Sequence, residues 1–190
     1  MKVCIVAEGC YPYVVGGVSG WINSLIQSFP NIEFILLTII ANRSSRGKFV
    51  YELPKNVTQV YEVYLEDCEW NNGKKRQKNR KHIRLSKKEY AEMLNMVLNR
   101  KTDWNILFDL FQRKNLSIDD LLMGPDFFQI ARECYNRKYS GIIFSDFLWT
   151  LRSIYLPMFW VLKMNIPKAD LYHCVATGYA GVLGSMAVHF

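Results

Sequence analysis

Two adjacent glycines are the residues whose type and position most directly suggest ligand chemistry. Gly16 and Gly17 separate the apolar run Lys2–Glu8 from a segment with helical spacing that begins near Val18. A glycine loop after a parallel strand lets the backbone approach a ligand closely, and the free N–H groups at a helix start favour an anion or a hydroxyl-rich ligand. The alternative is that these glycines only permit the turn and tight packing of the helix on the sheet.

A second candidate group lies near the end of the sequence. Leu171–Ala176 has strand character and is followed by Thr177-Gly178-Tyr179-Ala180-Gly181, which would open a helix. In a doubly wound sheet this strand end shares one crevice with Gly16 and Gly17. His173 could hydrogen-bond sugar hydroxyls or a phosphate there, and the alternative is an ordinary histidine near a strand end.

The common nucleotide-binding motifs do not fit the glycine spacing. Gly9 and Gly16-Gly17 do not form the G-x-G-x-x-G pattern, and no G-x-x-x-x-G-K-[ST] loop occurs. The second apolar run ends in Ala41-Asn42-Arg43, so it lacks the acidic residue that would hydrogen-bond the ribose of NAD. Arg43 would suit NADP, but the glycine spacing disfavours a fragment of an NADP-dependent reductase.

Alternating strand and helix signals predict the scaffold that positions these residues. Lys2–Glu8 and Glu33–Ala41 are short β-branched runs, typical of strands buried on both faces. Between them, apolar residues recur at helical spacing from Val18 to Phe29, and Pro30 ends the helix. With a third strand at Val57–Leu65, this pattern predicts an α/β fold with a Rossmann-like, doubly wound parallel sheet.

From about residue 66 to residue 139 the strand–helix rhythm breaks. The patterns there predict helices at 87–100, 104–114 and 126–137, with a short turn near 117–122. We therefore expect one domain spanning 1–190, in which residues of about 66–139 form a basic loop and a helical insertion. A further helix at 146–164, interrupted or kinked at Pro157, leads to the strand near 171 and a last helix that runs to Phe190.

The basic stretch 74–88 contains nine Lys or Arg residues and no acid, within a chain of net charge +7. Attraction to an anionic surface, such as membrane lipids, is one interpretation, and a solvated loop is the other. Nucleic-acid binding is not expected, because aromatic residues are not interleaved with the charges.

A second stretch is rich in aromatic residues. It could stack on sugars or meet a membrane partner, but its helical spacing favours core packing. Its members are Phe144, Phe147, Trp149, Tyr155, Phe159 and Trp160.

The composition of the chain limits the class of protein, the metal sites and the cellular location that can be expected. Hydrophobic residues make up 50% and charged residues 22%, which is typical of a globular protein. Five cysteines without a C-x-x-C pair indicate a reducing compartment and no structural zinc, so no metal is expected. No secretory signal and no spanning helix are predicted. The expected location is the cytoplasm, with the inner face of the membrane as an alternative.

Two segments carry a family resemblance. Glu8–Trp21, which reads Glu-Gly-Cys-Tyr-Pro-Tyr-Val-Val-Gly-Gly-Val-Ser-Gly-Trp, resembles the amino-terminal motif of PelF-type retaining glycosyltransferases, which make Pel exopolysaccharide. Leu171–His173 together with Thr177–Gly184 is similar to the second signature of that family. A variable helical stretch lies between the two segments, and over that stretch the resemblance to the family is weak.

The resemblance implies a GT-B fold of the family 4-like type, with two Rossmann-like domains and the active site between them. The present chain would be the N-terminal, acceptor-side half. Gly16, Gly17 and Ser19 would face the donor phosphates, and His173, Thr177 and Tyr179 would be acceptor-side candidates. Relatives use UDP-glucose and need no metal or other cofactor.

The chain lacks the C-terminal donor domain with its paired glutamates, so the 190 residues alone are expected to be inactive, and no catalytic residue is assigned. The expected function of the full-length enzyme is transfer of a hexose from a UDP-sugar to a growing exopolysaccharide, as in biofilm formation. Its partners would be the UDP-sugar, the polysaccharide acceptor and membrane-bound synthase subunits. The alternative is a non-catalytic binding or scaffold domain of a membrane-associated polysaccharide-synthesis complex.

Overall fold

The computed structural model describes residues 1–68, 83–114 and 116–190. The chain divides into two compact units. The first combines Met1–Glu69 with Met164–Phe190, and the second is Trp70–Lys163. The first unit therefore draws on both ends of the chain, and the second is continuous in sequence.

The first unit is built on a four-stranded, all-parallel sheet with the order β3-β2-β1-β4. The strands are β1 (Lys2–Glu8), β2 (Glu33–Ile40), β3 (Val57–Tyr64) and β4 (Leu171–Cys174). The chain starts at the centre of the sheet, runs outward through β2 to β3, and returns to place β4 on the other side of β1. The predicted Rossmann-like α/β fold with a parallel sheet is confirmed.

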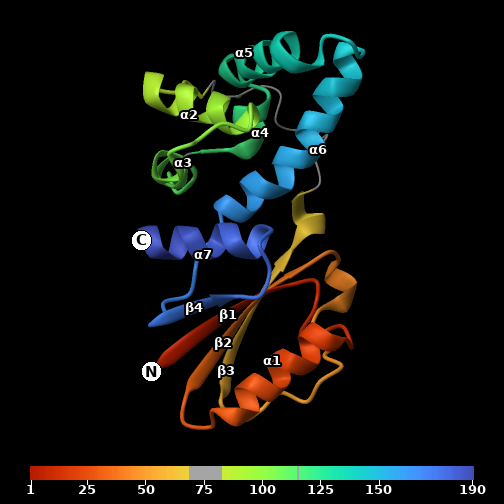
Figure 1. Cartoon of the computed structure of the whole chain (residues 1–190), viewed down its shortest axis with the longest axis vertical. Helices are drawn as coiled ribbons and strands as arrows, with labels where there is room; N and C mark the ends of the chain where they lie inside the picture. Colours follow the sequence, from red (N-terminus) through yellow and green to blue (C-terminus); the bar gives the residue numbers. More distant parts are fainter. Residues whose placement is uncertain (69–82, 115) are drawn as a thin grey trace. The chain divides into compact units, whose positions relative to one another are not determined.

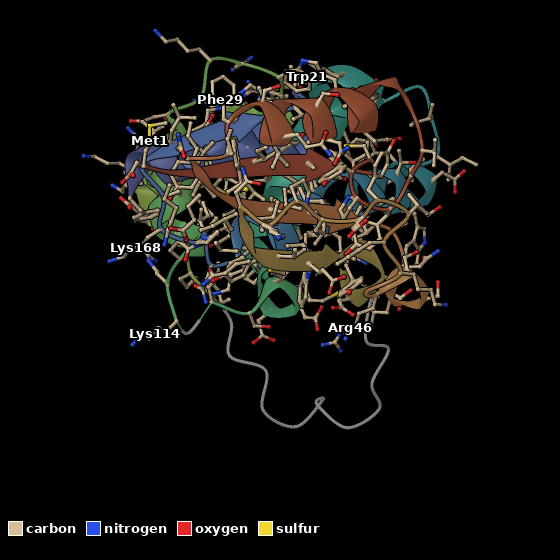
Figure 2. The ribbon with its side chains drawn as sticks, turned by 90° about the horizontal axis from the view of Figure 1, so that it is seen from below. Met1, Trp21, Phe29, Arg46, Lys114 and Lys168 are labelled. Carbon is tan, nitrogen blue, oxygen red and sulfur yellow. The ribbon has the colours of Figure 1, made fainter. Side chains whose placement is uncertain are left out.

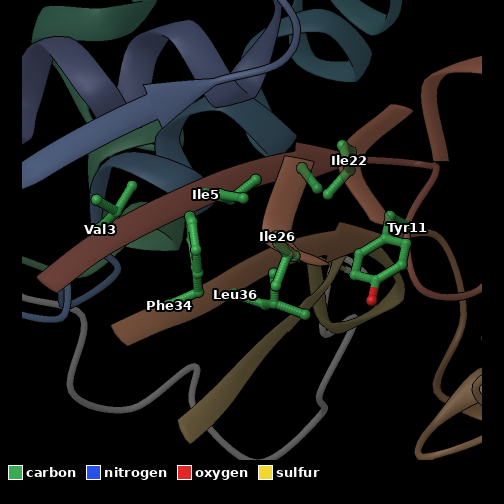
Figure 3. Close-up of a cluster of buried hydrophobic side chains, with 8 residues drawn as sticks. Val3, Ile5, Tyr11, Ile22, Ile26, Phe34 and Leu36 are labelled. Atoms are coloured by element: carbon green, nitrogen blue, oxygen red, sulfur yellow. The ribbon is translucent and has the colours of Figure 1, made fainter. Parts of the chain in front are cut away.

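Helices cover both faces of this sheet (Figure 1). Alternate residues of β1, namely Val3, Ile5 and Ala7, belong to one buried cluster with Ile22 and Ile26 of α1 (Gly17–Ser28). Figure 3 shows this cluster, in which Ile26 lies beside Leu36 of β2. Because successive strand residues point to opposite faces, β1 presents its remaining residues to the side covered by α7 (Tyr179–His189).

Two short 3-10 helices complete the first unit. One, η1 (Arg43–Ser45), follows β2, and the other, η2 (Leu65–Cys68), follows β3. The predicted strands and the first helix agree with the structure to within two residues at each end.

The second unit is helical in its described part. Its helices are α2 (Lys87–Val97), α3 (Trp104–Phe111), α4 (Ile118–Leu122), α5 (Pro125–Cys134), the π-helical segment η4 (Tyr135–Tyr139) and α6 (Phe144–Leu162). Aromatic rings meet in its core: the ring centroids of Phe111 and Phe159 are 4.7 Å apart, and those of Phe127 and Phe159 are 6.1 Å apart.

The structure refines two local predictions in this unit. The short turn predicted near 117–122 is the five-residue helix α4, whose start is capped because the Ser117 hydroxyl accepts a hydrogen bond from Asp120 N. Of the two alternatives predicted at Pro157, interruption is excluded, because α6 continues through the proline. Proline removes one backbone donor, and the helical assignment survives that loss.

The core interpretation of the aromatic stretch is confirmed for Phe147, Tyr155 and Phe159, which are buried. Trp149 is 63% exposed and does not belong to that core.

Of the basic stretch 74–88, residues 74–82 lie outside the described residues. Within the described ranges, no helix is long and apolar enough to cross a membrane.

Candidate functional site

The two sequence segments that resemble the glycosyltransferase motifs lie side by side in the first unit. Glu8 is the last residue of β1, and its Oε2 accepts a hydrogen bond from Ala180 N at 3.2 Å. Ala180 belongs to the first turn of α7, so the carboxylate stabilises the positive end of that helix. A methyl group on Gly178 would lie 2.8 Å from Glu8 Oε2, so a glycine there lets the carboxylate approach.

Tyr179 borders the same carboxylate. Burial, and secondarily the negative charge of Glu8, raise the pKa of the Tyr179 phenol above its ordinary value. The phenol therefore stays protonated at neutral pH and keeps its capacity to donate a hydrogen bond. Thr177 is exposed just ahead of it.

His173 faces α1. It is the penultimate residue of β4 and pairs with Ile5 of β1, whose side chain packs on the α1 side. Its ring lies against Trp21, with the ring centroids 5.5 Å apart and the planes at 40°. Trp21 is 48% exposed and His173 is partly exposed, so the pair presents an aromatic surface one turn beyond the glycine loop.

Neither a positive φ nor steric crowding requires glycine at Gly16 or Gly17. Gly16 has an extended backbone with φ 178°, which any residue adopts, and the positive φ of this turn falls at Gly9 instead. A methyl group on Gly16, Gly17 or Gly20 would meet no described atom within 4 Å. Tight packing therefore does not require a glycine at either position, whereas a local role at the helix start remains for Gly16, the N-cap of α1.

The start of α1 is also uncapped. Its N-cap residue is Gly16, which has no side chain that could accept a hydrogen bond from the first N–H groups, and its first turn contains no acidic residue. Free N–H groups at a helix start, beside glycines that leave space, form a surface suited to an anionic group.

Ser19 does not share that exposure. It is 1% exposed and lies beneath the surface of α1. Of the three residues expected to face donor phosphates, Gly16 and Gly17 are thus open to solvent and Ser19 is covered.

A network that the sequence did not reveal holds the glycine loop in place. The Tyr13 hydroxyl donates to Glu62 of β3, Gly47 N donates to the same carboxylate at 3.1 Å, and Val50 N donates to Pro12 O at 2.9 Å. Burial alone would raise the pKa of Glu62, but the hydrogen bonds from Tyr13 and Gly47 N–H lower it overall.

This network joins Tyr13 to Glu62 across 49 residues, and no local pattern could signal such a pairing. Glu8 and Trp21, by contrast, stand inside the segment that resembles the family motif, and that resemblance was the available signal for them.

Potential metal ligands do not gather at this site. Among residues 1–68, 83–114 and 116–190, no group of three or more His, Cys, Asp or Glu side chains could hold a metal ion.

These features define a Rossmann-like α/β domain whose open glycine loop lies at the helix start following its first strand, where such folds bind ligands. The model of a family described as a domain of unknown function, DUF3492, matches residues 1–190, and the chain belongs to this family. No curated protein matches the chain, and no solved structure does.

Proposed function

We propose that the chain is the N-terminal, acceptor-side domain of a PelF-type retaining glycosyltransferase with a GT-B fold. The complete enzyme would transfer a hexose, glucose or a close relative, from a UDP-sugar to a growing exopolysaccharide. DUF3492 is often associated with glycosyltransferase N-terminal domains, which supports this assignment.

The observation that carries the proposal is the open space at Gly16 and Gly17. Gly16 is the N-cap of α1, where glycine is an acceptable residue, but Gly17 is inside the helix, where glycine costs stability relative to alanine and the neighbouring atoms do not require it. Close approach of a ligand from outside the chain accounts for Gly17 and is compatible with Gly16. The donor diphosphate has the negative charge that the uncapped N–H groups of α1 would stabilise.

The pair of Trp21 and His173 suits the acceptor. An exposed indole face offers an apolar surface for the C–H face of a sugar ring, and the imidazole beside it can hydrogen-bond hydroxyl groups. Thr177 and Tyr179 add a hydroxyl and a protonated phenol at the start of α7. In this proposal the sugar donor is held mainly by a second Rossmann-like domain beyond Phe190.

Substitution of Gly17 tests the donor-side role in the longer protein that the proposal requires. Gly17→Ala should leave the fold intact, because a Cβ there meets no described atom within 4 Å, and circular dichroism checks that the larger Gly17→Val variant is folded. We expect kcat/KM for transfer from UDP-glucose to fall by about tenfold for Gly17→Ala and by about a hundredfold for Gly17→Val. Gly141→Ala is the matched control, because Gly141 has equally open surroundings in the second unit.

Unchanged transfer by the folded Gly17→Val variant would contradict the donor-side role. Absence of any calorimetric signal for both UDP and UDP-glucose with the longer protein would contradict glycosyl transfer altogether, and would favour the scaffold alternative. The isolated 190 residues should show no measurable heat with UDP.

Substitution of Trp21 tests the acceptor side with the present chain. Oligosaccharide binding, followed by chemical-shift changes during a titration, should weaken about tenfold in Trp21→Ala, because one stacked aromatic surface is lost. Phe29→Ala is the control: Phe29 is also 48% exposed and lies at the opposite end of α1 from Trp21 (Figure 2). Equal weakening by both variants would show that the binding is not located at Trp21.

A further inference from the structure

Glu8 presents a carboxylate oxygen that the fold leaves unused at the candidate site. It is the last residue of β1, is partly exposed, and points to the side of the sheet that α7 covers. Its Oε2 accepts the hydrogen bond from Ala180 N, while Oε1 makes no hydrogen bond to any residue that the structure describes. At the carboxyl edge of a parallel sheet, where such folds bind ligands, this oxygen can accept a hydrogen bond from a ligand.

The negative charge of Glu8 has no basic partner among the described side chains. The ion pairs of the first unit are Lys2–Glu33, Arg43–Asp67 and Arg46–Glu62. The positive end of α7, reached through Ala180 N, is the group that balances the charge of Glu8 in part. The surroundings of Oε1 therefore favour a neutral hydroxyl and repel a second anion.

The start of α7 adds groups that suit the same ligand. The Tyr179 phenol, protonated at neutral pH because its pKa is raised, can donate where Glu8 accepts. Thr177 is exposed and adds a hydroxyl that can do either. Gly178 keeps the carboxylate in place, since a methyl group there would lie 2.8 Å from Oε2 and 3.1 Å from Oε1. An acceptor, a donor and a hydroxyl match the hydroxyl groups of a sugar, and none of the three is a cation that would pair with a carboxylated sugar.

We propose that Glu8 determines the class of acceptor sugar, an inference that rests on the proposed function. Its free oxygen accepts a hydrogen bond from a hydroxyl of a neutral sugar, and its charge excludes sugars that carry a carboxylate. The same charge directs the donor diphosphate to the start of α1, because a carboxylate already occupies the start of α7. The anion and the neutral sugar are thereby bound at different helices.

Two matched trisaccharides test this role with the 190-residue chain: cellotriose, and its oxidised form in which each C6 hydroxymethyl group is a carboxylate. Chemical-shift titration at equal ionic strength should give a Kd for cellotriose at least about tenfold lower than that for the oxidised form. The net charge of the chain is +7, so attraction without a specific site would favour the acidic sugar instead.

The outcomes separate the role of Glu8 from the proposed function. Equal affinities, or tighter binding of the oxidised form, would overturn the role of Glu8 and leave sugar binding at this site standing. Absence of binding for cellotriose, for its oxidised form and for the differently linked maltotriose would overturn the acceptor site itself, and the role of Glu8 with it.

Glu8→Gln separates the charge of the side chain from its shape. Glutamine keeps the length and an oxygen that can accept from Ala180 N, so the start of α7 stays capped. The preference for cellotriose should fall from about tenfold to within about twofold, because cellotriose loses a charge-assisted hydrogen bond and the oxidised form no longer meets a like charge. An unchanged preference in this variant, confirmed as folded by circular dichroism, would refute the role of Glu8.

Glu52→Gln is the matched control, because Glu52 is an exposed glutamate of the same unit that precedes β3. It removes the same charge from the chain and should keep the preference of the wild type. An equal loss of preference in Glu52→Gln and Glu8→Gln would show that the discrimination reflects the net charge of the chain, and would overturn the assignment to Glu8.

Discussion

Glu62 shows how a single side chain on β3 fixes the loop that carries the candidate donor site. Its carboxylate accepts from the Tyr13 hydroxyl and from Gly47 N, and Arg46 Nε is 4.0 Å away. The Glu62 side chain is 17% exposed, so these contacts are largely shielded from water. The glycine loop is therefore held by a charged group that itself depends on pH.

Replacement of Glu62 by glutamine should lower the free energy of unfolding by about 2 kcal/mol at pH 7. The pKa of Glu62 lies below its ordinary value of 4.5 in the folded protein, so the stability it contributes is present above pH 4.5 and is lost as the pH falls through the folded value. Urea denaturation at a series of pH values measures this. The difference between wild type and Glu62→Gln should shrink below pH 4.5, and a constant difference would contradict the assignment.

Residue types and local spacing were enough to propose Gly16, Gly17 and His173, because a glycine pair after a strand and a histidine in a strand are visible in the sequence. Their contacts were not predictable. The stacking of His173 on Trp21 joins residues far apart in the chain, and the burial of Ser19 depends on how α1 is rotated on the sheet. These facts depend on tertiary packing.

The contact between α7 and β4 depends on one glycine. Gly184 is buried in α7, and a methyl group there would overlap the sulfur of Cys174 on β4. The close approach of this helix to the strand is the reason a glycine is tolerated in the middle of α7, where it weakens the helix.

A double-mutant cycle tests this contact. Gly184→Ala should destabilise the protein by about 1–3 kcal/mol through overpacking, and Cys174→Ala should cost less. The double variant should lose at least about 1 kcal/mol less free energy of unfolding than the sum of the two single losses. The reason is that removal of the sulfur leaves room for the new methyl group, which then lies 3.8 Å from the Cys174 Cβ. Thermal unfolding of the four proteins gives the coupling. Strictly additive losses would show that the helix and strand do not meet through these residues.

At the level of elements, the strands and most helices were predictable because each has its own period of apolar residues. Periodicity alone does not say which strands are neighbours, but the order β3-β2-β1-β4 is the one that the predicted Rossmann-like doubly wound topology implies. The sequence left open whether the helix at 146–164 is interrupted at Pro157, and the structure shows that α6 continues through it. Leu151, Tyr155 and Phe159 are buried and lie on one helical face on either side of the proline. The free energy gained by burying them outweighs the loss of the one backbone hydrogen bond that proline cannot donate, and the sequence around Pro157 shows only that loss.

The whole chain consists of two units with separate cores, one α/β and one helical. The helical unit interrupts the α/β unit between β3 and β4, so the sheet forms only when the two ends of the chain come together. Contacts within the helical unit are closer in sequence than those that join β1 to β4. A continuous unit with its own core is expected to fold independently of the flanking chain.

A fragment of residues 83–163 should therefore fold alone. It retains α2 to α6 and the contacts of Phe159 with Phe111 and Phe127, and its length is well above the roughly 40 residues below which a domain usually needs extra support. We expect a helical circular dichroism spectrum and one cooperative thermal transition. The counterpart fragment 1–68 should not show a cooperative transition, because without β4 and α7 one side of β1 and one face of the sheet stay uncovered. A non-cooperative melt for 83–163, or a cooperative one for 1–68, would show that the two cores are not separate in stability, and the helical unit would then have to be regarded as part of the α/β core.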